Sequence, residues 1–183
     1  FPVFRDDQRA RLWSAGHRDR MVDLSGRNMG ILALGDVGMA VAQRAHGFGM
    51  HVYAVDKLHT QERNTPPAVG EVWGLDRLDE LLRLSDWLVV TAPLTSETRG
   101  LIDRRRLGLL RRGSYVIVVS RGDIVDEAAL IDLLRSGQVA GAGLDATSVE
   151  PLPQDSPLWD MENVVLTPHC AAASPDRTEA RRE

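Results

Sequence analysis

Several residues able to bind a ligand stand where apolar stretches of the sequence stop. Tyr115 to Val119 is an apolar and β-branched run, and Arg121 and Gly122 follow it closely. Such a run is typical of a strand buried on both faces of a parallel sheet. Arg121 offers a rigid fork of donors to an anionic group, and Gly122 lets the chain turn. The run therefore predicts a ligand-binding side chain at the carboxyl end of a buried strand.

The same pattern recurs along the chain. Residues with polar side chains or special backbone properties stand at or just beyond the ends of other apolar runs: Gly35, Asp56, Pro93, Asp145 and His169. In open α/β sheets, ligands bind outside the carboxyl ends of the strands. We therefore expect these residues to line one binding site together with Arg121.

The stretch from Ala33 to Gly38 reads ALGDVG and lies between a predicted strand and a predicted helix. It is close to G-x-G-x-x-G, whose glycines and helix N-terminus receive a pyrophosphate, although Ala33 replaces the first glycine and Asp36 is acidic. Alone, it also fits a tight turn that holds no ligand. Asp56 follows Gly38 by 18 residues, near the spacing of an acid that bonds a ribose 2′-hydroxyl. The two features together predict a dinucleotide site.

The elements that must position these residues alternate between strand and helix. Apolar runs predict strands over 29–35, 50–56, 86–94, 115–119, 139–145 and 163–169. Helical spacing and glycine stops predict helices over 36–49, 75–85, 103–113 and 127–137, with Asp126 as the N-cap of the last one. Residues 57–70 read as a loop. This alternation predicts an α/β fold with a doubly wound parallel sheet.

The composition is that of an ordinary globular chain. Of its 183 residues, 43% are hydrophobic and 26% are charged, and the net charge is −4, which gives no pull toward nucleic acid or membrane. The basic residues between Arg104 and Arg112 are expected to form a solvated helix face. Cys170 is the single cysteine, so no internal disulfide can form. With no membrane-span-length apolar run and no signal peptide pattern, we expect a cytoplasmic protein.

Five segments resemble the D-isomer-specific 2-hydroxyacid dehydrogenases, in order and at the right spacings. They are GILALGDVG, APLTSETRGLID, VVSRGDIVDEAALIDLLRSGQVAGAGLD, EPLPQDSPLWD and NVVLTPH. The similarity extends from about Trp13 to about Ser174. It implies a Rossmann-type coenzyme-binding domain that binds NAD, with no metal. Asp56 favours NAD(H) over NADP(H), because its carboxylate would repel a 2′-phosphate, and Lys57 would soften this repulsion only in part.

The resemblance also implies a catalytic set, which by position is Arg121, Glu150 and His169. The family interconverts small 2-hydroxy acids and 2-oxo acids. In that reaction His169 exchanges a proton with the hydroxyl, Glu150 holds the imidazole, and Arg121 binds the substrate carboxylate. The cofactor carries the hydride. The expected cofactor contacts are Gly35, Asp36, Val37, Gly38, Asp56, Ala92, Pro93, Thr98, Val119, Ser120, Arg121, Asp145, His169, Ala171 and Ala172.

The resemblance predicts a division of the chain. Residues 1–25 are expected to be a linker helix, residues 26–175 the NAD-binding domain, and residues 176–183 the start of a C-terminal helix. Family members are nearly twice this long, so the substrate domain is expected to be absent and the chain alone inactive. A homodimer through the coenzyme domain is also implied. Leu12 and Trp13 are candidates for that contact, although they could equally pack on their own domain.

Two departures from the family pattern leave the substrate open. The stretch LDATSVEP, residues 144–151, stands where the family has an aromatic residue, and TPHCAAAS, residues 167–174, lacks a glycine that often follows the histidine.

Two alternative functions stay open. One alternative is a corepressor-like relative in which NAD binding controls a protein partner. The other is a formate dehydrogenase-like enzyme, whose histidine partner is a glutamine, and Glu150 disfavours it.

Overall fold

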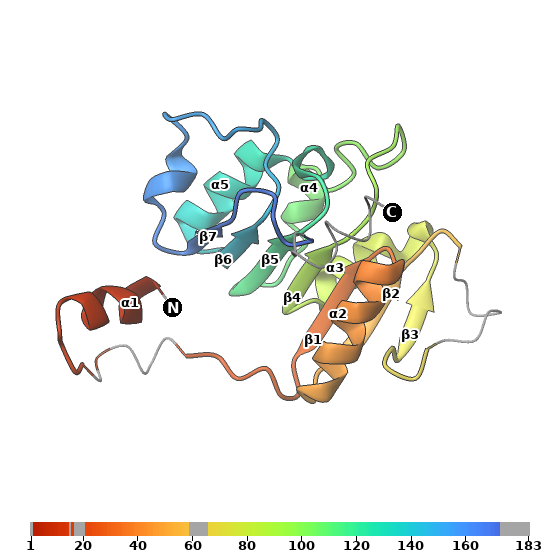
Figure 1. Cartoon of the computed structure of the whole chain (residues 1–183). Helices are drawn as coiled ribbons and strands as arrows, with labels where there is room; N and C mark the ends of the chain where they lie inside the picture. The colour runs from red at the N-terminus through yellow and green to blue at the C-terminus, as the bar shows by residue number, and fades with distance from the viewer. Residues whose placement is uncertain (1, 15, 17–20, 59–65, 173–183) are drawn as a thin grey trace, which may run out of the picture.

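The computed structural model describes residues 2–14, 16, 21–58 and 66–172, and within these residues seven strands form one parallel sheet (Figure 1). The strand order is β3-β2-β1-β4-β5-β6-β7. The strands are β1 (Asn28–Leu32), β2 (His51–Val55), β3 (Glu71–Trp73), β4 (Trp87–Val90), β5 (Ser114–Val118), β6 (Val139–Leu144) and β7 (Val164–Leu166). The order reverses between β1 and β4, which is the Rossmann arrangement, so the predicted doubly wound sheet is confirmed.

Helices cover both faces of the sheet. The covering helices are α2 (Asp36–Gly47), α3 (Leu78–Leu84), α4 (Arg104–Leu107) and α5 (Glu127–Ser136), and a further helix, α1 (Pro2–Arg9), precedes the sheet in the chain. Short 3-10 turns are η2 (Leu75–Arg77), η3 (Gly122–Ile124) and η4 (Pro157–Asp160). The buried side chains form two clusters because successive strand residues point to opposite faces. Ile31 packs with Ala42 and Ala45 of α2, whereas Leu32 joins Leu81 of α3 in the other cluster.

The expectation that the strand over 115–119 is buried on both faces holds for one face only. Val116 and Val118 of β5 are buried under α3, α4 and α5, but Tyr115, Ile117 and Val119 are only partly buried. On that second face α2 covers β1 and β2, and none of the helices in the described ranges covers β5 to β7 (Figure 1).

Several predicted boundaries are wrong for identifiable reasons. β1 ends at Leu32 rather than Gly35, because Ala33 takes a positive φ of 75° that no strand residue adopts. β7 ends at Leu166, and the helix expected over 103–113 is only the four-residue α4. The short edge strand β3 was not predicted. Asp126 is confirmed as an N-cap, since its carboxylate accepts a bond from the Ala129 amide at 2.9 Å.

The N-terminal segment is shorter as a helix than expected. α1 ends at Arg9, and Arg11 has a positive φ of 56°. Leu12 and Trp13 are 61% and 103% exposed, so the described residues cover little of them, and α1 lies apart from the sheet (Figure 1). The C-terminal helix expected over 176–183 lies outside the described residues. None of the helices in the described part is long and apolar enough to cross a membrane.

The basic stretch is tied to acidic residues of neighbouring helices. Asp79 of α3 accepts bonds from Arg105 at 2.6 Å and from Arg106 at 3.1 Å, and Arg104 pairs with Asp132 of α5 at 2.8 Å. The hydrogen bond from Arg105, helped by Arg106, lowers the pKa of Asp79 to about 2, although partial burial opposes this shift. These pairs connect α3, α4 and α5 on the outside of the sheet.

The lowered pKa of Asp79 predicts a pH-dependent contribution to stability. Because the folded-state pKa lies below the unfolded value, the contribution is present above the unfolded pKa and is lost as the pH falls toward 2. Asp79→Asn should lower the free energy of unfolding by up to about 1 kcal/mol at pH 7, since the pair is partly exposed. Urea unfolding at pH 7 and near pH 2 checks this, with Asp132→Asn as a control that removes only one contact. An equal loss at both pH values would contradict it.

Candidate active site

The carboxyl ends of six strands form one level row. In the register of the sheet Leu32 pairs with Val55 and Val90, and the row continues from Val90 through Val118 to Leu144 and then to Leu166 of β7. Every residue that follows one of these strands therefore emerges along the same edge. The residues expected to bind ligand, which follow these strands, thus share that edge.

The turn after β1 has the backbone of a dinucleotide-binding turn despite its alanine. Ala33, at the position of the first glycine, has a φ of 75°, a left-handed conformation that costs an L-residue of the order of 1–2 kcal/mol. The Thr91 hydroxyl lies 3.0 Å from the Leu32 carbonyl oxygen and 2.7 Å from that of Ala33. A Cβ on Gly38 would lie 2.3 Å from the Ala33 carbonyl oxygen, so only glycine allows α2 to pack this close.

Gly35, at the second glycine position of the motif, leaves room for a ligand. A Cβ at Gly35 would meet no atom within 4 Å, and Gly35 caps α2 without any side-chain hydrogen bond. The first amides of α2 have no acceptor within the helix and carry its positive dipole end. Open space beside unpaired amides fits a pyrophosphate. Asp36 and Val37 lie exposed in this first turn.

The Asp56 side chain accepts hydrogen bonds from backbone amides. Asp56 is 8% exposed, and its carboxylate accepts bonds from the Leu34 amide at 2.7 Å and the Leu58 amide at 2.6 Å. It therefore fixes the glycine turn to the end of β2. A carboxylate has further lone pairs, so a bond to a ribose hydroxyl stays a prediction. Lys57, beside it, pairs with Glu97 at 2.7 Å.

The segment after β4 is shaped by threonines. The Thr98 hydroxyl donates to the Pro93 carbonyl at 2.7 Å and accepts from the Thr95 amide at 2.8 Å. Ala92 is buried. Ser120, after β5, donates to the Val90 carbonyl at 3.2 Å. The threonine bonds fold the segment after β4, and the Ser120 bond attaches the segment after β5 to the end of β4, where cofactor contacts were expected.

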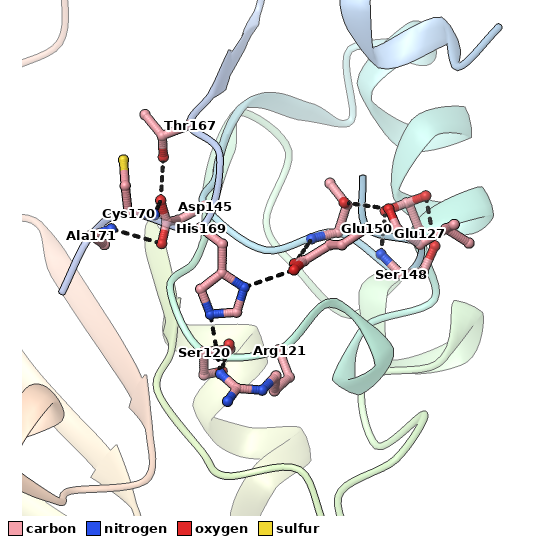
Figure 2. Close-up of polar contacts among 12 residues, drawn as sticks. Ser120, Arg121, Glu127, Asp145, Ser148, Glu150, Thr167, His169, Cys170 and Ala171 are labelled. Carbon is pink, nitrogen blue, oxygen red and sulfur yellow. Dashed lines mark hydrogen bonds and ion pairs between the residues drawn. The ribbon is translucent and has the colours of Figure 1, made fainter. Parts of the chain in front are cut away.

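Asp145 holds the loop that carries His169. Its carboxylate accepts bonds from the Thr167 hydroxyl at 2.6 Å and from the amides of Cys170 and Ala171 at 2.9 Å each (Figure 2). Burial raises the pKa of Asp145, but these bonds outweigh burial and leave the pKa below its usual value. The loop is thereby fixed although His169 has a positive φ of 51°. The nicotinamide contact expected of Asp145 remains a prediction, as do those of Ala171 and the exposed Ala172.

The three residues expected to be catalytic form a line. His169 Nδ1 lies 2.8 Å from Glu150 Oε2, and His169 Nε2 lies 3.3 Å from Arg121 Nη1 (Figure 2). A guanidinium can only donate, so Nε2 accepts and the proton of the neutral ring sits on Nδ1, where it donates to Glu150. This tautomer presents the basic Nε2 toward Arg121. The pair can therefore bind a carboxylate at Arg121 and exchange a proton at Nε2.

A hollow of about 220 Å³ lies at this line. Its lining residues come from the segments after β4, β5, β6 and β7: Leu94, Arg121, Gly122, Asp123, Thr147, Ser148, Glu150 and His169. The side chains of His169 and Glu150 are 41% and 40% exposed, so the hollow is open to water. A small anionic substrate fits such a site, but the described chain does not enclose it.

Sequence reasoning missed the hydroxyl residues that hold these segments. Thr91 directly follows β4 and Thr167 directly follows β7, and both bond the turns that carry the expected ligand contacts. Their position immediately after an apolar run was a usable signal. Ser148 and Glu127 were missed as well, because their contact joins residues 21 positions apart on different elements.

Comparison with known proteins gives one family. Residues 1–171 match the family described as D-isomer specific 2-hydroxyacid dehydrogenase, NAD binding domain. The chain is 41% identical over 152 residues to the glyoxylate reductase of Korarchaeum cryptofilum, covering 83% of this chain and 45% of that protein. It is 40% identical over 152 residues to the D-3-phosphoglycerate dehydrogenase of Bacillus subtilis, covering 83% of this chain and 28% of that protein. The chain thus spans less than half the length of either relative.

A solved structure is similar over almost the whole chain. The D-isomer specific 2-hydroxyacid dehydrogenase from Xanthobacter autotrophicus Py2, in complex with NADPH and MES, has a TM-score of 0.79 and 42% identity, covering 99% of this chain and 72% of that one. The family match and the parallel sheet with its glycine turn agree. The chain therefore belongs to the D-isomer specific 2-hydroxyacid dehydrogenase family and corresponds to the NAD-binding domain of that family.

Proposed function

We propose that this chain is the coenzyme-binding part of an NAD-dependent oxidoreductase that interconverts a small D-2-hydroxy acid and its 2-oxo acid. The observation that carries the proposal is the line of Glu150, His169 and Arg121 at the strand ends, on the same edge as the glycine turn. In the chain alone this line faces open solvent, so we expect cofactor binding without turnover. Water exclusion would need further protein.

The proposal gives each side chain a task that fits its position. Arg121 binds the substrate carboxylate and thereby places the hydroxyl at His169 Nε2, which accepts its proton. Glu150, 2.8 Å from Nδ1, stabilises the imidazolium that results. The turn at Gly35 and the residue Asp56 would hold a nicotinamide dinucleotide, whose chemistry is to accept the hydride. In the reverse direction His169 returns the proton to the 2-oxo acid.

Cofactor choice is the first prediction of this proposal. The Asp56 carboxylate would lie close to a 2′-phosphate, and Lys57 is paired with Glu97, so we expect tighter binding of NADH than of NADPH. The Xanthobacter relative is in complex with NADPH, which makes the test necessary. Asp56→Ala should narrow the gap by about tenfold or more, about 1.4 kcal/mol.

Calorimetric titration of the chain with both cofactors measures this preference. Asp56→Asn serves as a second variant, because an amide oxygen can keep one backbone contact while the charge is removed. Equal affinity of the unmodified chain for NADH and NADPH would refute the preference.

The second prediction concerns turnover by the full-length protein. His169→Ala should lower the rate about 10²–10⁴-fold, because it removes the proton-transfer group. Arg121→Lys should also be severe, since a point charge cannot reproduce the fork, and Glu150→Gln should mainly shift the pH profile. Glyoxylate, hydroxypyruvate, pyruvate and 3-phosphoglycerate are the substrates to screen. This screen also separates the enzyme from a corepressor-like NAD sensor.

The exposed histidine His51, at the opposite end of β2, provides the control, and His51→Ala should leave the rate unchanged. Normal turnover by all three site variants at every pH would show that the catalytic assignment is mistaken.

The third prediction is a homodimer. Leu12 and Trp13 are apolar residues that are largely exposed in the described part of the chain, and burying them against a second copy would remove this surface from water. Light scattering should give twice the mass of one chain, and Trp13→Ala should shift the population toward monomer. An unmodified chain that stays monomeric at high concentration would argue against the dimer.

A further inference from the structure

The segment that carries Glu150 is attached to the start of α5. The Ser148 amide donates to Glu127 Oε2 at 2.9 Å, and the Ser148 hydroxyl donates to Glu127 Oε1 at 2.8 Å (Figure 2). Glu127 is the first residue of α5, an element anchored in the core through Leu130 and Leu134. Both oxygens of one carboxylate therefore connect a surface segment to a rigid helix.

The same segment rests directly on the turn that carries Arg121. A Cβ on Gly122 would lie 2.1 Å from the Thr147 carbonyl carbon and 2.4 Å from the Ser148 nitrogen. This contact is between backbones, so the level of the segment above the turn is fixed. The two bonds of Ser148 to Glu127 help to set the rotation of the segment about this contact.

The segment also sets the direction of the Glu150 side chain. The Thr147 amide donates to Glu150 Oε1 at 3.2 Å, and the Thr147 hydroxyl donates to the Val149 carbonyl at 2.9 Å. The other carboxylate oxygen, Glu150 Oε2, forms the hydrogen bond with His169. Little apolar packing supports this arrangement, because Ser148, Val149 and Glu150 are all exposed. Polar bonds must supply the orientation.

We propose that Glu127 and Ser148 are positioning residues that hold Glu150 in line with His169. The inference deepens the proposed function and rests on it, since the pair that they position is the proposed catalytic pair. Without the contact to Glu127, the exposed segment would sample other rotations and Glu150 would spend less time at hydrogen-bond distance from Nδ1. The charged form of His169 would then be less stabilised.

A purely structural role for Glu127 has to be separated from this one. An acid in the first turn stabilises a helix through the dipole, independently of Ser148. Glu127→Gln removes that charge but can keep both contacts, because the amide oxygen accepts from the Ser148 amide and the amide nitrogen donates to the Ser148 hydroxyl. Glu127→Ala removes both the charge and the contacts.

The experiment follows the His169 ring signals of the whole 183-residue chain by NMR as the pH is varied. Glu150→Gln sets the scale and should lower the midpoint of the titration, because the charged ring loses the carboxylate beside Nδ1. Glu127→Ala should lower it by at least about half as much, and Ser148→Ala by less, since the amide bond survives. Glu127→Gln should stay close to the unmodified chain. Asp132→Ala, which removes another exposed acid from α5, should have no effect.

The outcomes separate this inference from the proposed function. An unchanged midpoint in Glu127→Ala, with the expected fall in Glu150→Gln, would overturn the positioning role and leave the catalytic pair in place. An equal fall of the titration midpoint in Glu127→Gln and Glu127→Ala would also overturn the positioning role, because the loss of charge alone would then be responsible. An unchanged midpoint in Glu150→Gln would overturn both the positioning role and the proposed catalytic pair. Unaltered NADH affinity in Ser148→Ala and Glu127→Ala shows that the fold is retained.

Discussion

The level pairing of six parallel strands is the constraint on which the site depends. Apolar side chains pack the strands against the helices, and parallel pairing brings the last strand residues into one row from Val55 to Leu166. Residues separated by more than a hundred positions in the chain are thus brought to one edge. No local motif could bring the glycine turn and His169 together without this sheet.

Above the row, carboxylates and hydroxyls bond the backbone of neighbouring segments. Asp56 holds the turn at Leu34, and Asp145 holds the loop at Cys170 and Ala171. The lowered pKa of Asp145 means that this stabilisation is present above the unfolded pKa and is lost only in acid as the pH falls through the folded pKa. Residues first read as ligand contacts thus also build the site that would receive the ligand.

Much of the fold and the line of three side chains could be predicted from the sequence. Apolar runs marked the strands, although β1 and β7 end earlier than predicted, at Leu32 and Leu166. The family pattern picked out Glu150. The strand β3 escaped because three residues carry no periodicity. The contact between Glu127 and Ser148 escaped because it depends on how a surface segment lies on a helix, which no spacing rule encodes.

In the proposed function, one dinucleotide lies across the row, from the glycine turn to the His169 loop. NMR of the chain during an NADH titration tests it most directly, with the amides of Asp36, Val37 and Gly38 and the ring of His169 as reporters. We expect all of these signals to shift and to saturate at the same NADH concentration. Shifts at the turn with none at His169, or no shifts at the turn, would contradict it.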